Sequence, residues 1–186
     1  MRVETERLIL RPWEDRDLDP FAALNADLEV MRYFPATRTR EETAALMDYT
    51  RVMLDESGMS FLAVEEKASG DFVGMVGLAP VKPPMPCAPA VEIGWRLAKH
   101  QWGKGYASEA ANAWLVHGFE TLALPEIVAF TYVGNEPSRR VMERLGMTRD
   151  PLDDFQHPGI AQGHKLRPHV LYRITAADFR QRAAQG

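Results

Sequence analysis

Cysteine is nearly absent from this sequence, since Cys87 is the only one among 186 residues. No internal disulfide can form, and a reducing compartment is compatible with the chain. A single cysteine also excludes a zinc knuckle, and no histidine pair has the spacing that places two ligands on one helix face. We therefore expect no metal site. Cys87 stands in a stiff, proline-rich segment, so we do not expect it to be a catalytic nucleophile.

Long apolar runs and an excess of positive charge are also missing. No run approaches the ~20 residues of a membrane span, and no signal-peptide core precedes a cleavage site, so we expect a cytoplasmic protein without a membrane partner. The 22 basic and 26 acidic residues give a net charge of −4, which argues against general nucleic-acid binding but not against a local basic patch. The length and the 46% hydrophobic share predict one soluble globular domain over residues 1–186.

The stretch 90–122 organises the rest of the chain. Its first part alternates with the period of two of a β-strand, and Glu92 falls in mid-strand on the face opposite Val91 and Ile93. From Ala107 onward the apolar spacing becomes the three and four of an amphipathic helix. A loop with two glycines, Trp102-Gly103-Lys104-Gly105-Tyr106-Ala107, joins strand and helix.

This loop predicts an anion site. The first turn of a helix has unpaired backbone N–H groups and the positive end of the macrodipole, and Lys104 adds a mobile cation. An ordinary strand-to-helix turn remains the alternative. Two other phosphate motifs fit less well, because a Walker A loop needs Lys-Ser or Lys-Thr and the dinucleotide fingerprint needs glycine where this chain has Ser108.

The remaining pattern predicts the other elements and the fold class. We expect a strand at 6–11, helices at 17–25 and 40–57, strands at 59–66 and 71–81 joined by a hairpin turn at 68–71, a strand at 127–132, a helix at 136–145, strands at 147–155 and 169–175, and a short helix from 176. This order indicates a single α/β domain with a mixed, mostly antiparallel sheet flanked by helices. A ligand crevice is expected beside the central strand and the glycine loop.

The loop resembles that of the GCN5-related N-acetyltransferases, and within them the branch that acetylates ribosomal-protein N-termini. In that family an Arg/Gln-x-x-Gly-x-Gly/Ala loop holds the pyrophosphate of acetyl-CoA. Gly105 and Ala107 occupy its last two fixed positions here, whereas Trp102 replaces the usual Arg or Gln. The segments 5–12 and 135–147 are similar to the same branch, so the resemblance spans nearly the whole chain.

The resemblance implies acetyl-CoA as the co-substrate. We assign to its binding Trp95, Arg96, Leu97, Trp102, Gly103, Lys104, Gly105, Tyr106, Ala107, Ser108, Asn135 and Ser138. Asn135 also stands where a helix N-cap is wanted, and capping alone explains it. By resemblance it contacts the pantetheine arm as well, and both interpretations stay open.

Glu92 is the candidate general base. An α-amino group titrates near 8 and a lysine near 10.4, so either amine must lose a proton before or during attack. A carboxylate on a rigid strand can accept that proton if burial raises its pKa; an exposed strand glutamate is the alternative. Many family members use a tyrosine as the general acid where this chain has Met142. The resemblance assigns this role to Ser138, for which a plain first-turn serine is the alternative.

The acceptor side is less well defined. By resemblance, Tyr33 and Phe34 are substrate-wall candidates, although local core is the simpler explanation of these aromatics. His157 and His169 are candidates to face the acceptor, with satisfied strand histidines as the alternative. We expect acetyl transfer from acetyl-CoA to a primary amine in a ternary complex, without an acyl-enzyme.

Several alternatives stay open for the acceptor and the assembly. A protein N-terminus is one acceptor, and a small amine such as an antibiotic or polyamine is another. A non-catalytic acyl-CoA sensor is an alternative of a different class. The oligomeric state is left open, a homodimer included.

Overall fold

The computed structural model describes residues 2–184. The chain divides into two units. The first contains the residues up to Ala79 and the segment Gly94–Ala113, and the second contains Pro80–Ile93 and the residues from Trp114 onward. No helix of the described residues is long and apolar enough to cross a membrane.

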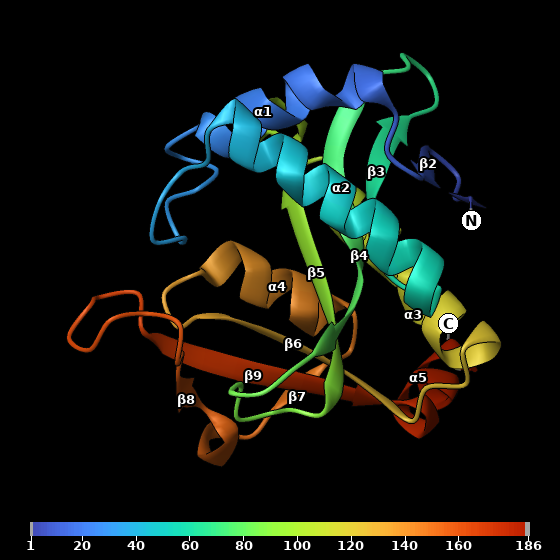
Figure 1. Ribbon diagram of the computed structural model, residues 1–186. Helices are drawn as coiled ribbons and strands as arrows, with labels where there is room; N and C mark the ends of the chain where they lie inside the picture. Colours follow the sequence, from blue (N-terminus) through green and yellow to red (C-terminus); the bar gives the residue numbers. More distant parts are fainter. Residues whose placement is uncertain (1, 185–186) are drawn as a thin grey trace. The chain divides into compact units, whose positions relative to one another are not determined.

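The first unit contains an antiparallel ladder of strands (Figure 1). Its members are β1 (Val3–Glu4), β2 (Leu8–Arg11), β3 (Phe61–Glu66) and β4 (Phe72–Val81), the last of which continues by two residues into the second unit. A bulge between Val64 and Glu65 shifts the register of β3 against β4. Nearly all of β4 is buried, because apolar residues and glycines occupy both of its faces.

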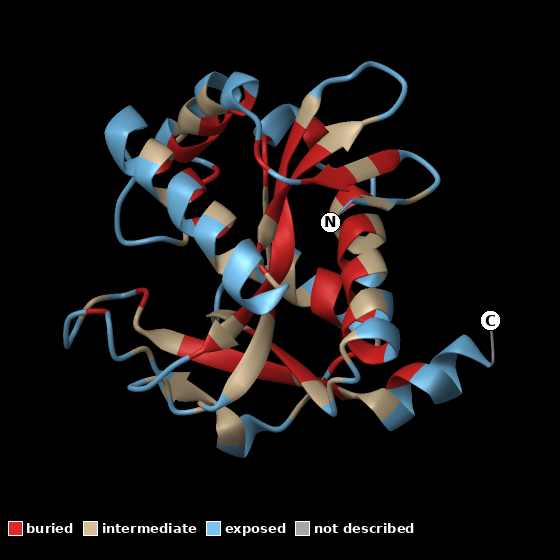
Figure 2. Cartoon of the chain, turned by 45° about the vertical axis from the view of Figure 1, so that its right-hand side comes forward, coloured by how far each residue is buried: buried red, intermediate tan, exposed pale blue. Residues whose placement is uncertain are grey.

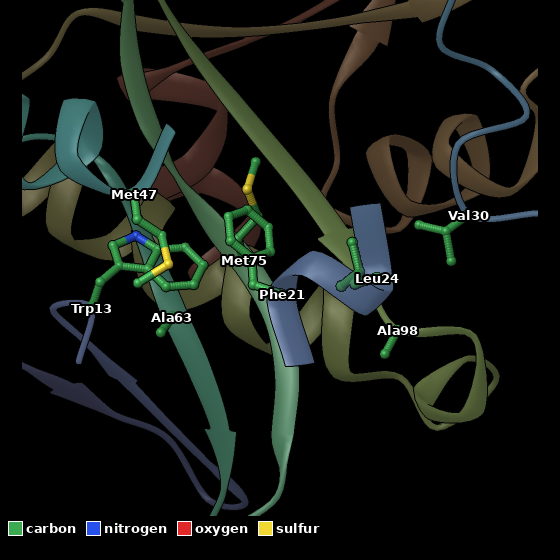
Figure 3. Close-up of a cluster of buried hydrophobic side chains, with 8 residues drawn as sticks. All are labelled: Trp13, Phe21, Leu24, Val30, Met47, Ala63, Met75 and Ala98. Atoms are coloured by element: carbon green, nitrogen blue, oxygen red, sulfur yellow. The ribbon is translucent and has the colours of Figure 1, made fainter. Parts of the chain in front are cut away.

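Two helices, α1 (Leu18–Ala26) and α2 (Arg40–Ser57), pack on each other in this unit (Figure 1). A capping box fixes the start of α2, because Thr39 accepts from the backbone N–H of Glu42 and Glu42 accepts from that of Thr39. Gly58 ends the helix with a φ of 68°. The buried cluster drawn in Figure 3 consists of Trp13, Phe21, Leu24, Val30, Met47, Ala63, Met75 and Ala98.

Three elements carry the central stretch of the sequence. They are β5 (Ala90–Leu97), the short 3-10 helix η2 (Lys99–Gln101) and α3 (Tyr106–Val116), which continues as a π-helical turn over His117–Thr121. The unit boundary falls within β5, after Ile93, and within α3, after Ala113. The glycine loop between η2 and α3 therefore belongs to the first unit.

The second unit is built around β6 (Glu126–Tyr132) and β9 (Pro168–Thr175). These strands are antiparallel from Glu126 opposite Thr175 to Tyr132 opposite His169. The first half of β5 adds a parallel step, with Glu92 in register with Val128. The core beside them contains Val81, Val128 and Leu171. In Figure 2 the buried residues gather on the strands and on α3, whereas exposed residues predominate on α2.

Two helices and two short strands complete this unit. The helices are α4 (Glu136–Arg144) and α5 (Ala176–Ala183). The strands β7 (Thr148–Arg149) and β8 (Phe155–Gln156) both pair with β9. The prediction of one continuous strand over 147–155 is therefore wrong. Pro151 has no N–H for a ladder, and Asp150 accepts from the backbone N–H of Leu152, so a 3-10 turn, η4 (Pro151–Asp153), interrupts the strand.

The other predicted elements are confirmed. Helix α2 has the predicted bounds, and the remaining predicted strands and helices differ from the observed ones by one or two residues. The strand predicted at 6–11 begins at Leu8. The fold class is confirmed as α/β with a mixed, mostly antiparallel sheet flanked by helices. The assignment of residues 1–186 to a single domain stays a prediction.

Candidate functional site

The glycine loop has the backbone conformation that the anion-site prediction requires. Gly103 and Gly105 have φ values of 76° and 84°, in the region that side-chain-bearing residues rarely adopt. A Cβ on Gly103 would meet nothing within 4 Å, so conformation and not crowding explains the glycine there. The chain then enters α3 at Tyr106, which leaves the first N–H groups of a helix next to the loop.

A polar atom in the first turn of α3 supports the same assignment. The Oγ atom of Ser108 is buried and has no hydrogen-bond partner among the described residues. Buried hydroxyl groups in folded proteins are normally satisfied. A phosphate oxygen at the start of α3 would supply an acceptor, so the residues present fit a pyrophosphate bound by this loop.

An ion-pair network holds the loop against the N-terminal segment. The Arg7 side chain pairs with Glu109, with 2.7 Å from Nε to Oε2, and donates from Nη1 to the Lys104 carbonyl at 3.0 Å. The backbone N–H of Arg7 and the hydroxyl of Thr5 donate to Oε1 of Glu109. Sequence reasoning missed Arg7 and Glu109 as site residues, because no local pattern connects positions 102 residues apart.

The other predicted loop residues have defined partners. The indole N–H of Trp102 donates to the Leu97 carbonyl at 2.9 Å, although the Trp102 side chain stays 40% exposed. The Nζ of Lys104 donates to Gln101 at 2.8 Å. The hydroxyl of Tyr106 donates to Glu66, and this hydrogen bond raises the pKa of Tyr106. These contacts within the chain help to fix the shape of the loop.

The acceptor-wall candidates Tyr33 and Phe34 each lie against an arginine. The Arg32 guanidinium is 4.7 Å from the Tyr33 ring centroid, and the Arg96 guanidinium is 4.2 Å from that of Phe34. The Phe34 side chain is 40% exposed, so it is not part of a closed core. The local-core interpretation therefore does not account for Phe34.

Glu92, in the second unit, has a perturbed pKa. Burial raises the pKa of Glu92 to about 7, with no charged neighbour contributing. At neutral pH its carboxylate is therefore about half ionised, which suits a group that must accept and later release a proton. The nearby Cys87 thiol is half-buried, and burial raises its pKa too. A raised pKa leaves less thiolate, in line with the expectation that Cys87 is not a nucleophile.

Asn135 caps α4, as predicted. Its Oδ1 accepts from the backbone N–H of Ser138 at 3.3 Å, and its Nδ2 donates to the hydroxyl of Thr131 at 2.8 Å. Ser138 is partly exposed in the first turn of the helix. Met142, where the resemblance would place a general-acid tyrosine, is buried in the core. The structure thus brings Asn135 and Ser138 together, while their roles toward a ligand stay predictions.

His157 and His169 lie next to each other, with ring centroids 4.8 Å apart, beside the rings of Phe130 and Phe155. Burial lowers the pKa of both imidazoles, so both are mainly neutral at pH 7. His169 Nδ1 lies 3.1 Å from the Arg167 carbonyl, which favours a proton on Nδ1 and leaves Nε2 as an acceptor. Residues 2–184 gather no group of three or more potential metal ligands.

Comparison with known proteins completes the description of the site. A family model described as an acetyltransferase (GNAT) domain matches residues 7–148. The uncharacterized N-acetyltransferase YnaD of Bacillus subtilis is 32% identical over 180 residues, which cover 96% of this chain and 99% of YnaD. The FsC-acetyl coenzyme A-N(2)-transacetylase of Aspergillus fumigatus is 31% identical, covering 95% of this chain and 77% of that protein. The crystal structure of a GNAT-family acetyltransferase from Bacillus anthracis is 29% identical with a TM-score of 0.79, covering 95% of this chain and 99% of that one.

Proposed function

We infer that this chain, which belongs to the acetyltransferase (GNAT) family, transfers the acetyl group of acetyl-CoA to a primary amine. The family assignment makes the chain an acetyl-CoA-dependent N-acetyltransferase. The acceptor and the roles of individual residues are our proposals. The glycine loop with Ser108 would hold the pyrophosphate of the co-substrate through backbone N–H groups and the hydroxyl.

The pKa of Glu92 is the observation that carries the proposal of turnover over that of a passive acyl-CoA sensor. A sensor has no need of a buried carboxylate whose pKa is raised to about 7 without a compensating cation. In the proposed reaction Glu92 accepts the proton of the amine, directly or through water. The amine nitrogen bonds to the thioester carbon, the carbon–sulfur bond breaks, and Ser138 relays a proton from water to the leaving thiolate, so its own hydroxyl is restored. No acyl-enzyme forms.

Two acceptor classes remain, each with its own support. Similarity to the branch that acetylates ribosomal-protein N-termini favours a protein α-amino group. The 31% identity to the FsC-acetyl coenzyme A-N(2)-transacetylase favours a small-molecule amine as the second candidate. An α-amino group is the less demanding substrate, because a larger fraction of it is already neutral at pH 7.

A panel experiment tests the proposal. The protein is incubated with acetyl-CoA and a mixed set of N-terminal peptides and small amines, while thiol release and product mass are recorded. We expect acetylated product with at least one amine class, and we expect the Glu92→Gln variant to bind acetyl-CoA normally by calorimetry while turning over slowly. Tight acetyl-CoA binding without product from any amine would support the sensor instead.

A further inference from the structure

Arg96, on β5 in the first unit, has an unusual environment for a cation. Its Nη1 donates to Oδ1 of Asn25 at 2.6 Å. Asn25 is fully buried and its Nδ2 donates to the hydroxyl of Thr43 at 3.2 Å, so the group that holds Arg96 is itself fixed. One face of the guanidinium lies 4.2 Å from the ring centroid of Phe34. These contacts therefore restrain the position of the Arg96 guanidinium.

Arg96 has no compensating negative charge among residues 2–184. No carboxylate among the described residues forms an ion pair with it, and the charge that acts on it is a second cation, Arg38. The Nε atom of Arg96 is buried and has no hydrogen-bond partner in the described chain. Burial, and then Arg38, lower the pKa of Arg96 to about 10, which still leaves the group charged at neutral pH. Buried arginines are normally paired with an acid, so Arg96 is a candidate to bind an anion that is not part of the chain.

The geometry restricts the shape of that anion. Asn25 occupies Nη1 and Phe34 covers one face of the guanidinium. The edge that remains is formed by Nε and Nη2, whose two parallel N–H groups match the two oxygens of a carboxylate. Phe34 is 40% exposed and Arg38 is exposed, so the residues that cover this side of the cluster lie at the protein surface. Nε itself is buried, so a carboxylate would reach this edge by displacing the exposed Phe34 side chain, without unfolding the core.

We propose that the amine acceptor carries a carboxylate, which the Nε and Nη2 groups of Arg96 bind as a pair while Arg38 adds a second positive charge. This inference rests on the proposed function, because it names the chemical class of that reaction's acceptor. In this proposal the Arg96 side chain binds the acceptor and not acetyl-CoA. From the sequence, by contrast, Arg96 is expected to bind acetyl-CoA. A phosphate of CoA is the other source of oxyanion, and the experiment separates the two.

The test compares acceptors that differ only in a carboxylate. Suitable pairs are Ala-Glu-amide with Ala-Gln-amide, and 4-aminobutyrate with its amide. We expect the parent to show a KM for the acidic member at least about tenfold below that for the neutral member, the scale of one charge-assisted hydrogen bond. Arg96→Lys keeps the charge but loses the paired donors, so it should raise the KM of the acidic member by about tenfold or more and leave that of the neutral member unchanged.

Further variants and a binding measurement make the outcomes distinct. Arg38→Gln changes an exposed residue and should weaken the preference for the acidic acceptor by less than about tenfold. This variant keeps the inference testable if Arg96→Lys folds poorly. Arg40→Gln is the matched control, because Arg40 is an exposed arginine already paired with Asp19. Its acceptor preference should equal that of the parent. CoA affinity, measured by calorimetry, should be the same in all four proteins.

Two results would overturn the inference. Equal KM values for acidic and neutral amines in the parent would leave the acetyltransferase function standing without the carboxylate site. A loss of CoA affinity in Arg96→Lys would assign the oxyanion to the CoA phosphates. If no amine is acetylated, calorimetry with the same acidic and neutral compounds still tests the carboxylate site. The acidic compound should bind the parent more tightly than the neutral one, and this difference should disappear in Arg96→Lys.

Discussion

Burial acts on two ionisable residues of opposite charge in this protein, and neither has an oppositely charged partner among residues 2–184. The pKa of Glu92 is raised to about 7 and that of Arg96 is lowered to about 10. In both cases desolvation is the main cause, which indicates that the charged form was not selected for stability. We attribute Glu92 to proton transfer and Arg96 to recognition of an acidic acceptor.

The catalytic role of Glu92 predicts a distinct pH–rate profile. In the parent, kcat/KM should rise as the pH passes through about 7, because the carboxylate is then deprotonated and can act as a base. Glu92→Gln should lower turnover by about 10² near neutral pH and lack this rise. The loss should shrink at higher pH, where more of the amine arrives neutral. Parallel profiles for the two proteins would remove Glu92 from the mechanism and favour His157, His169 or solvent as the proton acceptor.

The same residue predicts a pH-dependent stability difference. The folded pKa of Glu92 lies above its unfolded value of 4.5, so folding binds a proton and the parent loses stability as the pH rises from about 4.5 through 7. The rise of the Glu92 pKa from 4.5 to about 7 corresponds to a loss of about 3 kcal/mol in the free energy of unfolding above pH 7. Glu92→Gln removes this penalty, so it should match the parent near pH 4.5 and exceed it at pH 8. Urea unfolding at both pH values measures the difference, and a variant that is less stable at pH 8 would contradict it.

At the scale of elements, the sequence predicted what local signals determine. The bounds of α2 were predicted because Thr39 and Gly58 mark them directly. The strand at 147–155 was not, because β7 and β8 form by pairing with β9 on either side of a local turn. The loop was predicted from its glycines, but its contact with Arg7 and the uncompensated burial of Arg96 arise only from tertiary structure. Local chemistry thus indicated the candidate site, whereas long-range contacts shape it.

The loop itself predicts a separation of stability from binding. Gly105→Val places a β-branched residue at a φ of 84° next to Arg7, so it should lower the free energy of unfolding by about 1–3 kcal/mol and abolish CoA binding. Gly58→Val is the matched control, since that glycine has a φ of 68° at the end of α2 with nothing within 4 Å of a Cβ. It should lose similar stability and keep its CoA affinity. Calorimetric titration of CoA into both variants checks this, and unchanged affinity in Gly105→Val would refute the phosphate-binding role of the loop.

At the scale of the whole molecule, the chain divides into two units, whereas the family model matches residues of both units. The match covers residues 7–148, and the strand β5 and the helix α3 each begin in one unit and end in the other. A chain whose elements cross the boundary in this way should not unfold in parts. We therefore keep the assignment of a single domain as a prediction about cooperativity.

Scanning calorimetry tests that prediction together with the ligand. The protein should unfold in one transition, with the calorimetric enthalpy equal to the van't Hoff enthalpy. CoA at about 100 times its Kd stabilises the folded state by about 2.7 kcal/mol, and this should raise the single Tm by about 5–10 °C for a chain of this length. Gly105→Val should unfold in one transition that CoA does not move. Two transitions, of which CoA shifts only one, would show instead that the units fold independently, because binding at the loop would then stabilise the first unit alone.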